Sequence, residues 1–158
     1  MKKLILLSIA VPFLFAFENA DQLKLTDLEI SVEESESILR YDFMIENTGE
    51  SVIKSDFDYP GHNPIGIEFV VTPEDTLAKQ MEMVNHTKFK KMLMIERGNP
   101  GYFAPGQKTP FHISYKIKES ANVEKVLDHA LKAKLLILDG VQISKEYPLN
   151  KYKDKVLH

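Results

Sequence analysis

The chain has 158 residues, of which 27% are charged, and a formal net charge of −3. Its lysines are scattered, so this mildly acidic balance predicts no nucleic-acid partner. The absence of cysteine excludes a thiol nucleophile, a disulfide framework and a lipid-modified cysteine anchor.

The first twenty residues have the pattern of an export signal. Lys2 and Lys3 precede an apolar run from Leu4 to Phe17, and a basic start followed by such a run is typical of a secretory signal peptide. The run is shorter than the roughly 20 residues of a membrane-spanning helix. We therefore expect the chain to be exported, to the extracellular space or the cell envelope.

The end of this signal is less clear. Cleavage after Ala16 or after Ala20 would follow a small residue, but neither position completes an A-x-A pattern. An uncleaved N-terminal anchor therefore stays open as the third alternative. In each case residues 1–20 form the signal or anchor, and residues 21–158 are expected to form a single domain.

Alternating apolar and polar residues predict strands along most of that domain. Residues 39–46 place Leu39, Tyr41, Phe43 and Ile45 on one side, and residues 111–118 repeat the pattern. A period of two indicates a strand with one buried face. Further strands are expected at 28–32, 65–71, 89–95, 133–138 and 141–147.

Turn residues separate these strands, for example Asn47-Thr48-Gly49-Glu50 and Asp139-Gly140. Seven or more short strands in one domain predict an all-β, antiparallel β-sandwich. The side chains expected to be buried between its two sheets are Tyr41, Phe43, Ile45, Phe111, Ile113, Tyr115 and Leu136.

Two segments favour short helices within this sandwich. In 72–84, Thr72 is a candidate N-cap and Pro73 a first helical residue, while alternation gives a strand through Met81 and Met83. Both alternatives stay open for this segment. In 120–134 we expect a short helix capped by Ser120 that bridges two strands. Its apolar stripe would be Val123, Val126, Leu127, Ala130 and Leu131.

Four segments together resemble immunoglobulin-like sandwich modules from the outer side of bacterial membranes. They are "LRYDFMIENTGESVIKSDFDYP", "IGIEF", "FAPGQKTPFHISYKI" and "KAKLLILDGVQI", and the resemblance covers about Leu25 to Tyr147. It implies an immunoglobulin-like fold in a bacterial extracytoplasmic protein. It implies no catalytic residue, since one fold hosts many functions.

The stretch "DFDYPGHNPIG" is the most polar candidate for a site. Asp56 and Asp58 are two residues apart and are weak candidates for calcium ligands. However, calcium takes six to eight oxygen ligands, and only two carboxylates are local here. We therefore favour a chain crossover between sheets, in which Phe57 enters the core and both aspartates face water.

Motifs for other chemistries are absent. In "GYFAPGQKT", Gln107 separates the glycine from the lysine that a phosphate-binding loop requires, and an alternating strand follows where a helix would be needed. The chain contains neither G-x-S-x-G nor H-E-x-x-H. The sequence thus predicts no catalytic residue and no cofactor.

Exposed aromatic residues are the remaining candidates for a binding surface. Tyr59 and Tyr102 would share one end of the sandwich and suit a protein or cell-surface glycan partner. Phe103, which lacks a polar group, is expected to pack on the core.

These observations predict a non-catalytic interaction or structural module of the cell envelope or extracellular space. Membrane contact is expected only if the N-terminal segment stays uncleaved. A secreted inhibitor of a hydrolase, working through an exposed loop, is one alternative. An enzyme of unrecognised type is the other.

Overall fold

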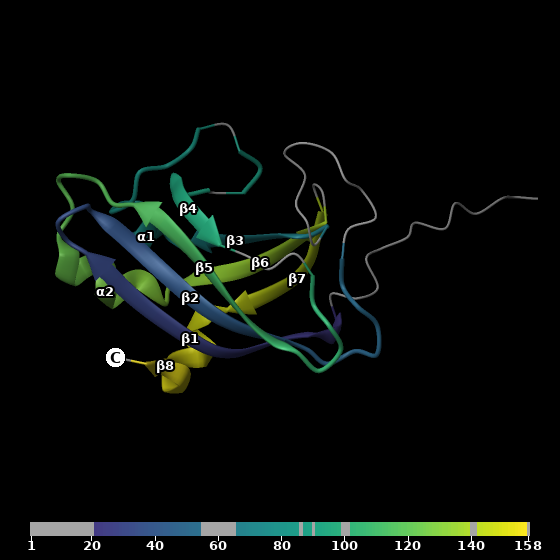
Figure 1. Ribbon diagram of the computed structural model, residues 1–158. Helices are drawn as coiled ribbons and strands as arrows, with labels where there is room; N and C mark the ends of the chain where they lie inside the picture. Colours follow the sequence, from purple (N-terminus) through teal and green to yellow (C-terminus); the bar gives the residue numbers. More distant parts are fainter. Residues whose placement is uncertain are drawn as a thin grey trace, which may run out of the picture.

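The computed structural model describes residues 21–54, 66–85, 87–89, 91–98, 102–139 and 142–157 (Figure 1). The helices of this part are α1 (Asp75–Ala78), α2 (Val123–Ala130) and the 3-10 helix η2 (Leu149–Lys155). Its strands, in chain order, are β1 (Leu23–Glu33), β2 (Ile38–Asn47), β3 (Glu68–Pro73), β4 (Met94–Gly98), β5 (Lys108–Lys116), β6 (Ala133–Asp139), β7 (Gln142–Pro148) and β8 (Val156–Leu157).

The strands form two sheets. The larger has the order β4-β5-β2-β1-β8 and the smaller the order β3-β6-β7. All pairs are antiparallel except the short parallel pairing of β8 with β1. The predicted all-β sandwich with a few short helices is therefore confirmed.

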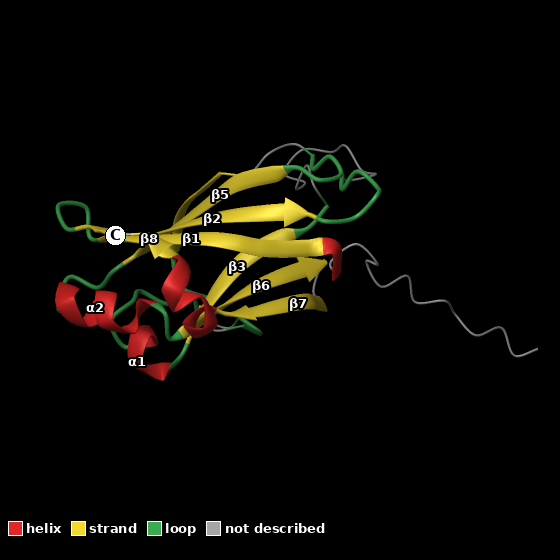
Figure 2. Cartoon of the chain, turned by 90° about the horizontal axis from the view of Figure 1, so that it is seen from below, coloured by secondary structure: helices red, strands yellow, loops and turns green. Residues whose placement is uncertain are grey.

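The inner faces of the two sheets pack against each other (Figure 2). Phe69 of β3 lies on Phe111 of β5, with ring centroids 4.4 Å apart. The Val71 backbone N–H of β3 donates to the Tyr115 hydroxyl of β5 at 2.8 Å. Because the chain has no cysteine to link the sheets, apolar packing and such buried hydrogen bonds hold them together.

Helices α1 and α2 lie beside the smaller sheet and cover the end of the larger sheet that it leaves open (Figure 2). The Asn122 side chain caps α2 by accepting from the Lys125 N–H at 3.0 Å. At the other end of α2, the buried Tyr41 hydroxyl donates to the Ala130 carbonyl at 2.8 Å. The helix is thus attached to the core at its C-terminus.

Both helical segments are shorter than the sequence suggests. In 72–84, Pro73 ends β3 on a sheet edge, where its missing N–H is tolerated, and only one helical turn follows. Met81 and Met83 then form isolated bridges to Ile117 and Met92, so the segment is neither a continuous helix nor a continuous strand. The predicted cap of the second helix was wrong, since Asn122 replaces Ser120. Leu127 was also misassigned, because it is 47% exposed.

Six of the seven predicted core residues lie in the main core between the sheets, and one does not. Leu136 is buried, but it lies on the outer face of β6 in a small cluster with Val70 and Leu138. Phe89 packs against this cluster. β6 is the central strand of its sheet and is apolar on both faces, so alternation alone could not assign Leu136 to the correct side. The residues confirmed in the main core are Tyr41, Phe43, Ile45, Phe111, Ile113 and Tyr115.

The strand predicted at 89–95 was misplaced. The strand that pairs with β5 is β4, at Met94–Gly98. Met92 forms an isolated bridge to Met83. Phe89 lies outside the larger sheet and packs against the outer cluster of the smaller sheet. The local pattern does not contain these contacts. They place the strand closer to the C-terminus than predicted.

The buried tyrosines make stability fall at alkaline pH. Burial raises the pKa of Tyr41, Tyr115 and Tyr147 above the ordinary value near 10. Above about pH 10 the unfolded chain releases these protons while the native state keeps them, so the unfolding free energy falls by up to about 1.4 kcal/mol per pH unit per tyrosine. We expect denaturant melts of the Tyr41→Phe variant to show a shallower alkaline decline than wild type. Leu127→Ala removes an exposed side chain that does not titrate and should keep the wild-type slope. Equal slopes for all three proteins would contradict this mechanism.

Candidate functional site

The predicted site residues fall partly outside the described chain. Asp56, Asp58 and Tyr59 lie there, so the crossover, the weak metal site and the role of Tyr59 stay predictions. Tyr102 is described and is 59% exposed. Phe103 is fully buried, 5.1 Å from the Phe111 ring centroid, which confirms its expected place in the core.

The buried side chain of Asn47 organises the loops around Tyr102. Its Nδ2 donates to the carbonyls of Ser51 at 2.8 Å and Phe103 at 3.3 Å. Its Oδ1 accepts from the Gly49 N–H at 3.0 Å. One side chain thereby joins the loop after β2 to the segment before β5. Tyr102 lies next to Phe103, which is one of the residues that this side chain holds.

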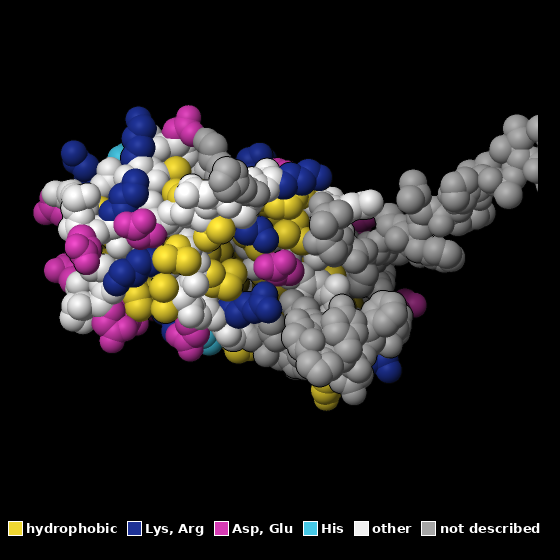
Figure 3. Space-filling model, turned by 90° about the horizontal axis from the view of Figure 1, so that it is seen from above, with side chains coloured by type: hydrophobic (Ala, Val, Ile, Leu, Met, Phe, Trp, Pro, Cys, Tyr) yellow, Lys and Arg dark blue, Asp and Glu magenta, His cyan; other side chains and the backbone are white. Residues whose placement is uncertain are grey.

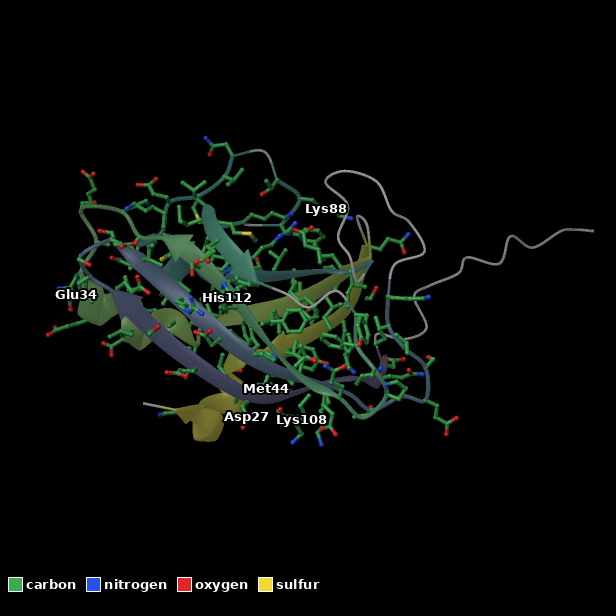
Figure 4. The ribbon with its side chains drawn as sticks, viewed as in Figure 1. Asp27, Glu34, Met44, Lys88, Lys108 and His112 are labelled. Atoms are coloured by element: carbon green, nitrogen blue, oxygen red, sulfur yellow. The ribbon has the colours of Figure 1, made fainter. Side chains whose placement is uncertain are left out.

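The outer face of the larger sheet carries an open depression of about 230 Å³. It is lined by the acidic residues Asp27, Glu29 and Asp42 and the apolar residues Leu28, Phe43, Met44 and Pro110. Figure 4 labels Asp27 and Met44. Arg40 already pairs with Asp42, with 2.7 Å between Nε and Oδ2. The depression is smaller than the roughly 300–1,000 Å³ of typical small-molecule sites, so its geometry does not favour a small-molecule ligand.

The described ranges contain no group of three or more histidine or acidic side chains that could hold a metal ion. No helix within the same ranges has the length and apolar character needed to cross a membrane.

β4 is an edge strand with an exposed apolar side chain. It ends the larger sheet, and no described strand pairs with its outer side. Ile95 on β4 is 51% exposed, and Leu93 just before it is 41% exposed. Figure 3 shows apolar side chains gathered over this region between charged ones. The Leu93 N–H donates to the Glu82 carbonyl at 2.7 Å and its carbonyl accepts from the Lys116 N–H at 2.9 Å, so its backbone is already paired. We call Met94–Gly98, together with the side chain of Leu93, the β4 edge.

Every sheet edge makes some contacts, and β4 is no exception, since its Arg97 lies 3.6 Å from the Glu68 carboxylate of β3. β8 pairs with part of β1. On β3, the Val71 N–H is taken up by the Tyr115 hydroxyl. On β7, Lys145 donates to the carbonyls of Asp21 and Leu23, both at 2.9 Å. Unpaired edge groups are a template for pairing with another chain. Of the exposed apolar side chains on described edge strands, Ile95 of β4 at 51% is more exposed than Ile143 of β7 at 41%, which favours β4 for such pairing.

A histidine supports the far end of the β4 edge. The His112 ring lies so close to Gly98 that a Cβ there would come within 2.2 Å of the ring carbon Cε1. Its Nε2 is 3.6 Å from the Glu96 carboxylate. Only glycine at position 98 leaves room for the His112 ring beside β4. The Glu96 side chain lies next to this ring and is 62% exposed.

Sequence reasoning missed the β4 edge. Residues 92–95 are all apolar, so alternation could not separate the buried Met92 from the exposed Leu93 and Ile95.

The searches of protein-family models, curated proteins and solved structures found no significant match to this chain.

Proposed function

We propose that this chain is an exported, non-catalytic interaction module that binds an extended segment of a partner protein along the β4 edge. The observation that carries the proposal is that no described strand pairs with the outer side of β4, next to the exposed Ile95. Leu93 adds only its exposed side chain, because its backbone is already hydrogen-bonded to Glu82 and Lys116. In strand addition, main-chain hydrogen bonds supply affinity and alternate side chains supply specificity.

The charges on β4 favour a foreign segment over a second copy of this chain. β4 contains Glu96, Arg97 and a bulge between Met94 and Glu96, and charges and bulges oppose indiscriminate edge pairing. Antiparallel self-pairing centred on Glu96 would place two carboxylates opposite each other, which is destabilising. A partner with apolar residues against Leu93 and Ile95 and a basic residue near Glu96 would fit.

We further infer that the module is immunoglobulin-like and belongs to a bacterial envelope or extracellular protein. Support comes from the strand order. In chain order, β1, β2, β4 and β5 share one sheet and β3, β6 and β7 share the other, as strands A, B, D, E and C, F, G do in seven-stranded immunoglobulin domains. The N-terminal export pattern and the earlier resemblance support the location.

Photocrosslinking tests the binding surface. A photoreactive phenylalanine analogue at Ile95 of the full chain should crosslink a discrete protein from an envelope extract of the producing cells. The same analogue at Leu127, which is 47% exposed on α2, should not. A synthetic peptide covering the crosslinked segment should bind wild type, and Ile95→Lys should weaken that binding while Ile143→Lys on β7 should not.

The peptide also separates strand addition from simple apolar contact. N-methylation of alternate residues removes the backbone donors that a strand needs. Each backbone hydrogen bond contributes about 1 kcal/mol, so losing two should weaken binding by roughly tenfold or more. Unchanged affinity after methylation in both registers, or equal crosslinking from Ile95 and Leu127, would refute the proposal.

A further inference from the structure

The end of the sandwich where β1 begins carries two exposed apolar side chains. Tyr102 is 59% and Val52 45% exposed. They sit on adjacent segments, because Ile53 and Phe103 exchange two backbone hydrogen bonds of 2.9 Å each. We call the segments Asp21–Leu23, Thr48–Lys54 and Tyr102–Gln107 the loop end. It lies opposite α2 (Figures 1 and 2).

The start of the domain is fixed at this loop end. The Thr48 backbone N–H and hydroxyl both donate to the Gln22 carbonyl at 2.7 Å. On the other side, Lys145 donates to the carbonyls of Asp21 and Leu23, and the Tyr147 hydroxyl also donates to that of Leu23. Four donors thus hold Asp21–Leu23, so the chain enters the fold at a defined place.

The apolar run Leu4–Phe17 is joined to the chain just before this place. Four residue steps separate Phe17 from Asp21, and they can span at most about 14 Å. If the run enters a bilayer, the loop end must therefore be the described part of the sandwich nearest the membrane. Even as a helix the run would measure about 21 Å, which is short of the roughly 30 Å hydrocarbon core. A short apolar segment draws its flanking residues toward the bilayer.

We propose that residues 1–20 are retained as an anchor, and that the loop end rests on the lipid bilayer with Tyr102 and Val52 in the membrane interface. Tyrosine suits this position because its ring is apolar and its hydroxyl is polar. The proposal rests on the export component of the proposed function but not on the β4 edge. In this orientation α2 is the most distant helix from the membrane.

The charges at the loop end define the lipid chemistry. Within the described residues, the exposed Lys54 is offset by the exposed Glu50. The exposed Lys24 and Lys108 of the adjoining strands are offset by the exposed Asp21 and the half-buried Glu46. Contact with a balanced surface of this kind depends on the apolar side chains rather than on anionic headgroups. Vesicles of zwitterionic phosphatidylcholine should therefore be sufficient.

Single-tryptophan variants test the orientation, since the chain has no tryptophan of its own. The full chain carrying Tyr102→Trp or Val52→Trp is reconstituted into phosphatidylcholine vesicles. We expect a blue-shifted emission and strong quenching by lipids brominated near the headgroup. The control is Leu127→Trp on α2, which should emit as in water and resist quenching.

Three outcomes would overturn the proposal. They are equal quenching of the Tyr102→Trp and Leu127→Trp variants, emission of the loop-end variants as in water while the chain floats with vesicles, and failure of the full chain to float with vesicles at all. None of them affects crosslinking at Ile95. The failure of the membrane contact and the failure of the proposed partner site are thus distinguishable.

Discussion

Truncation of Phe43 to alanine should lower the unfolding free energy by about 3–5 kcal/mol, the usual cost of removing a buried phenylalanine ring. Phe43 lies in the middle of β2, is 2% exposed, and stacks on Tyr41 with ring centroids 5.9 Å apart. It belongs to the main core, which is close-packed, so the structure cannot easily close the space that the ring leaves. Urea melts followed by circular dichroism measure the change.

Two control variants define this result. Phe43→Leu keeps most of the volume and should cost clearly less than Phe43→Ala. Leu127→Ala removes an exposed side chain and should stay within about 0.5 kcal/mol of wild type. A Phe43→Ala protein that loses less than about 1 kcal/mol would show that the core can collapse around this position.

Replacement of Asn47 by aspartate should cost about 3–5 kcal/mol at neutral pH, because it leaves an uncompensated buried charge. The change preserves shape and the acceptor for the Gly49 N–H. It also turns the donor to the Ser51 and Phe103 carbonyls, at 2.8 and 3.3 Å, into an oxygen that repels them. Since Asn47 joins the segments that carry Val52 and Tyr102, the loop end should loosen first.

The pH dependence of this variant identifies the cause. Burial beside two carbonyl groups should raise the pKa of the new carboxyl above the ordinary value of about 3.9. Between the two values the native state binds a proton that the unfolded chain does not, so stability relative to wild type should recover as the pH falls from 7 toward 4. Asn122→Asp makes the same chemical change at an exposed cap and should be nearly neutral. A pH-independent loss would mean that repulsion from the two carbonyls is not the cause.

Local pattern was sufficient where a strand has one buried and one wet face. β2 and β5 satisfy this condition, and their period of two correctly assigned Tyr41, Phe43, Phe111 and Ile113 to the core. It failed where both faces are covered or where an edge is apolar on both sides. Leu136 on β6 and Ile95 on β4 are the two cases, and in each the side of the strand depends on segments that are distant in the sequence.

The short C-terminal elements are a further case. η2 and β8 follow β7, and β8 pairs with β1 more than a hundred residues earlier in the chain. A two-residue strand is too short to show a periodic pattern in the sequence. Its pairing depends on where the preceding helix η2 ends relative to β1. The same holds for the hydrogen bond of Tyr41 to Ala130, 89 residues away, and for the bond of Asn47 to Phe103, 56 residues away.

By itself, the sequence determined that this chain forms an all-β sandwich with few short helices, and which faces of β2 and β5 are buried, because a half-buried strand imposes a local period of two. Only the tertiary structure decided the order of the strands within each sheet, the open side of β4, the outer position of Leu136 and the attachment of Asp21–Leu23 at the loop end. These features depend on which segments, distant in the sequence, contact one another. Those contacts are determined by packing of the whole core rather than by neighbouring residues.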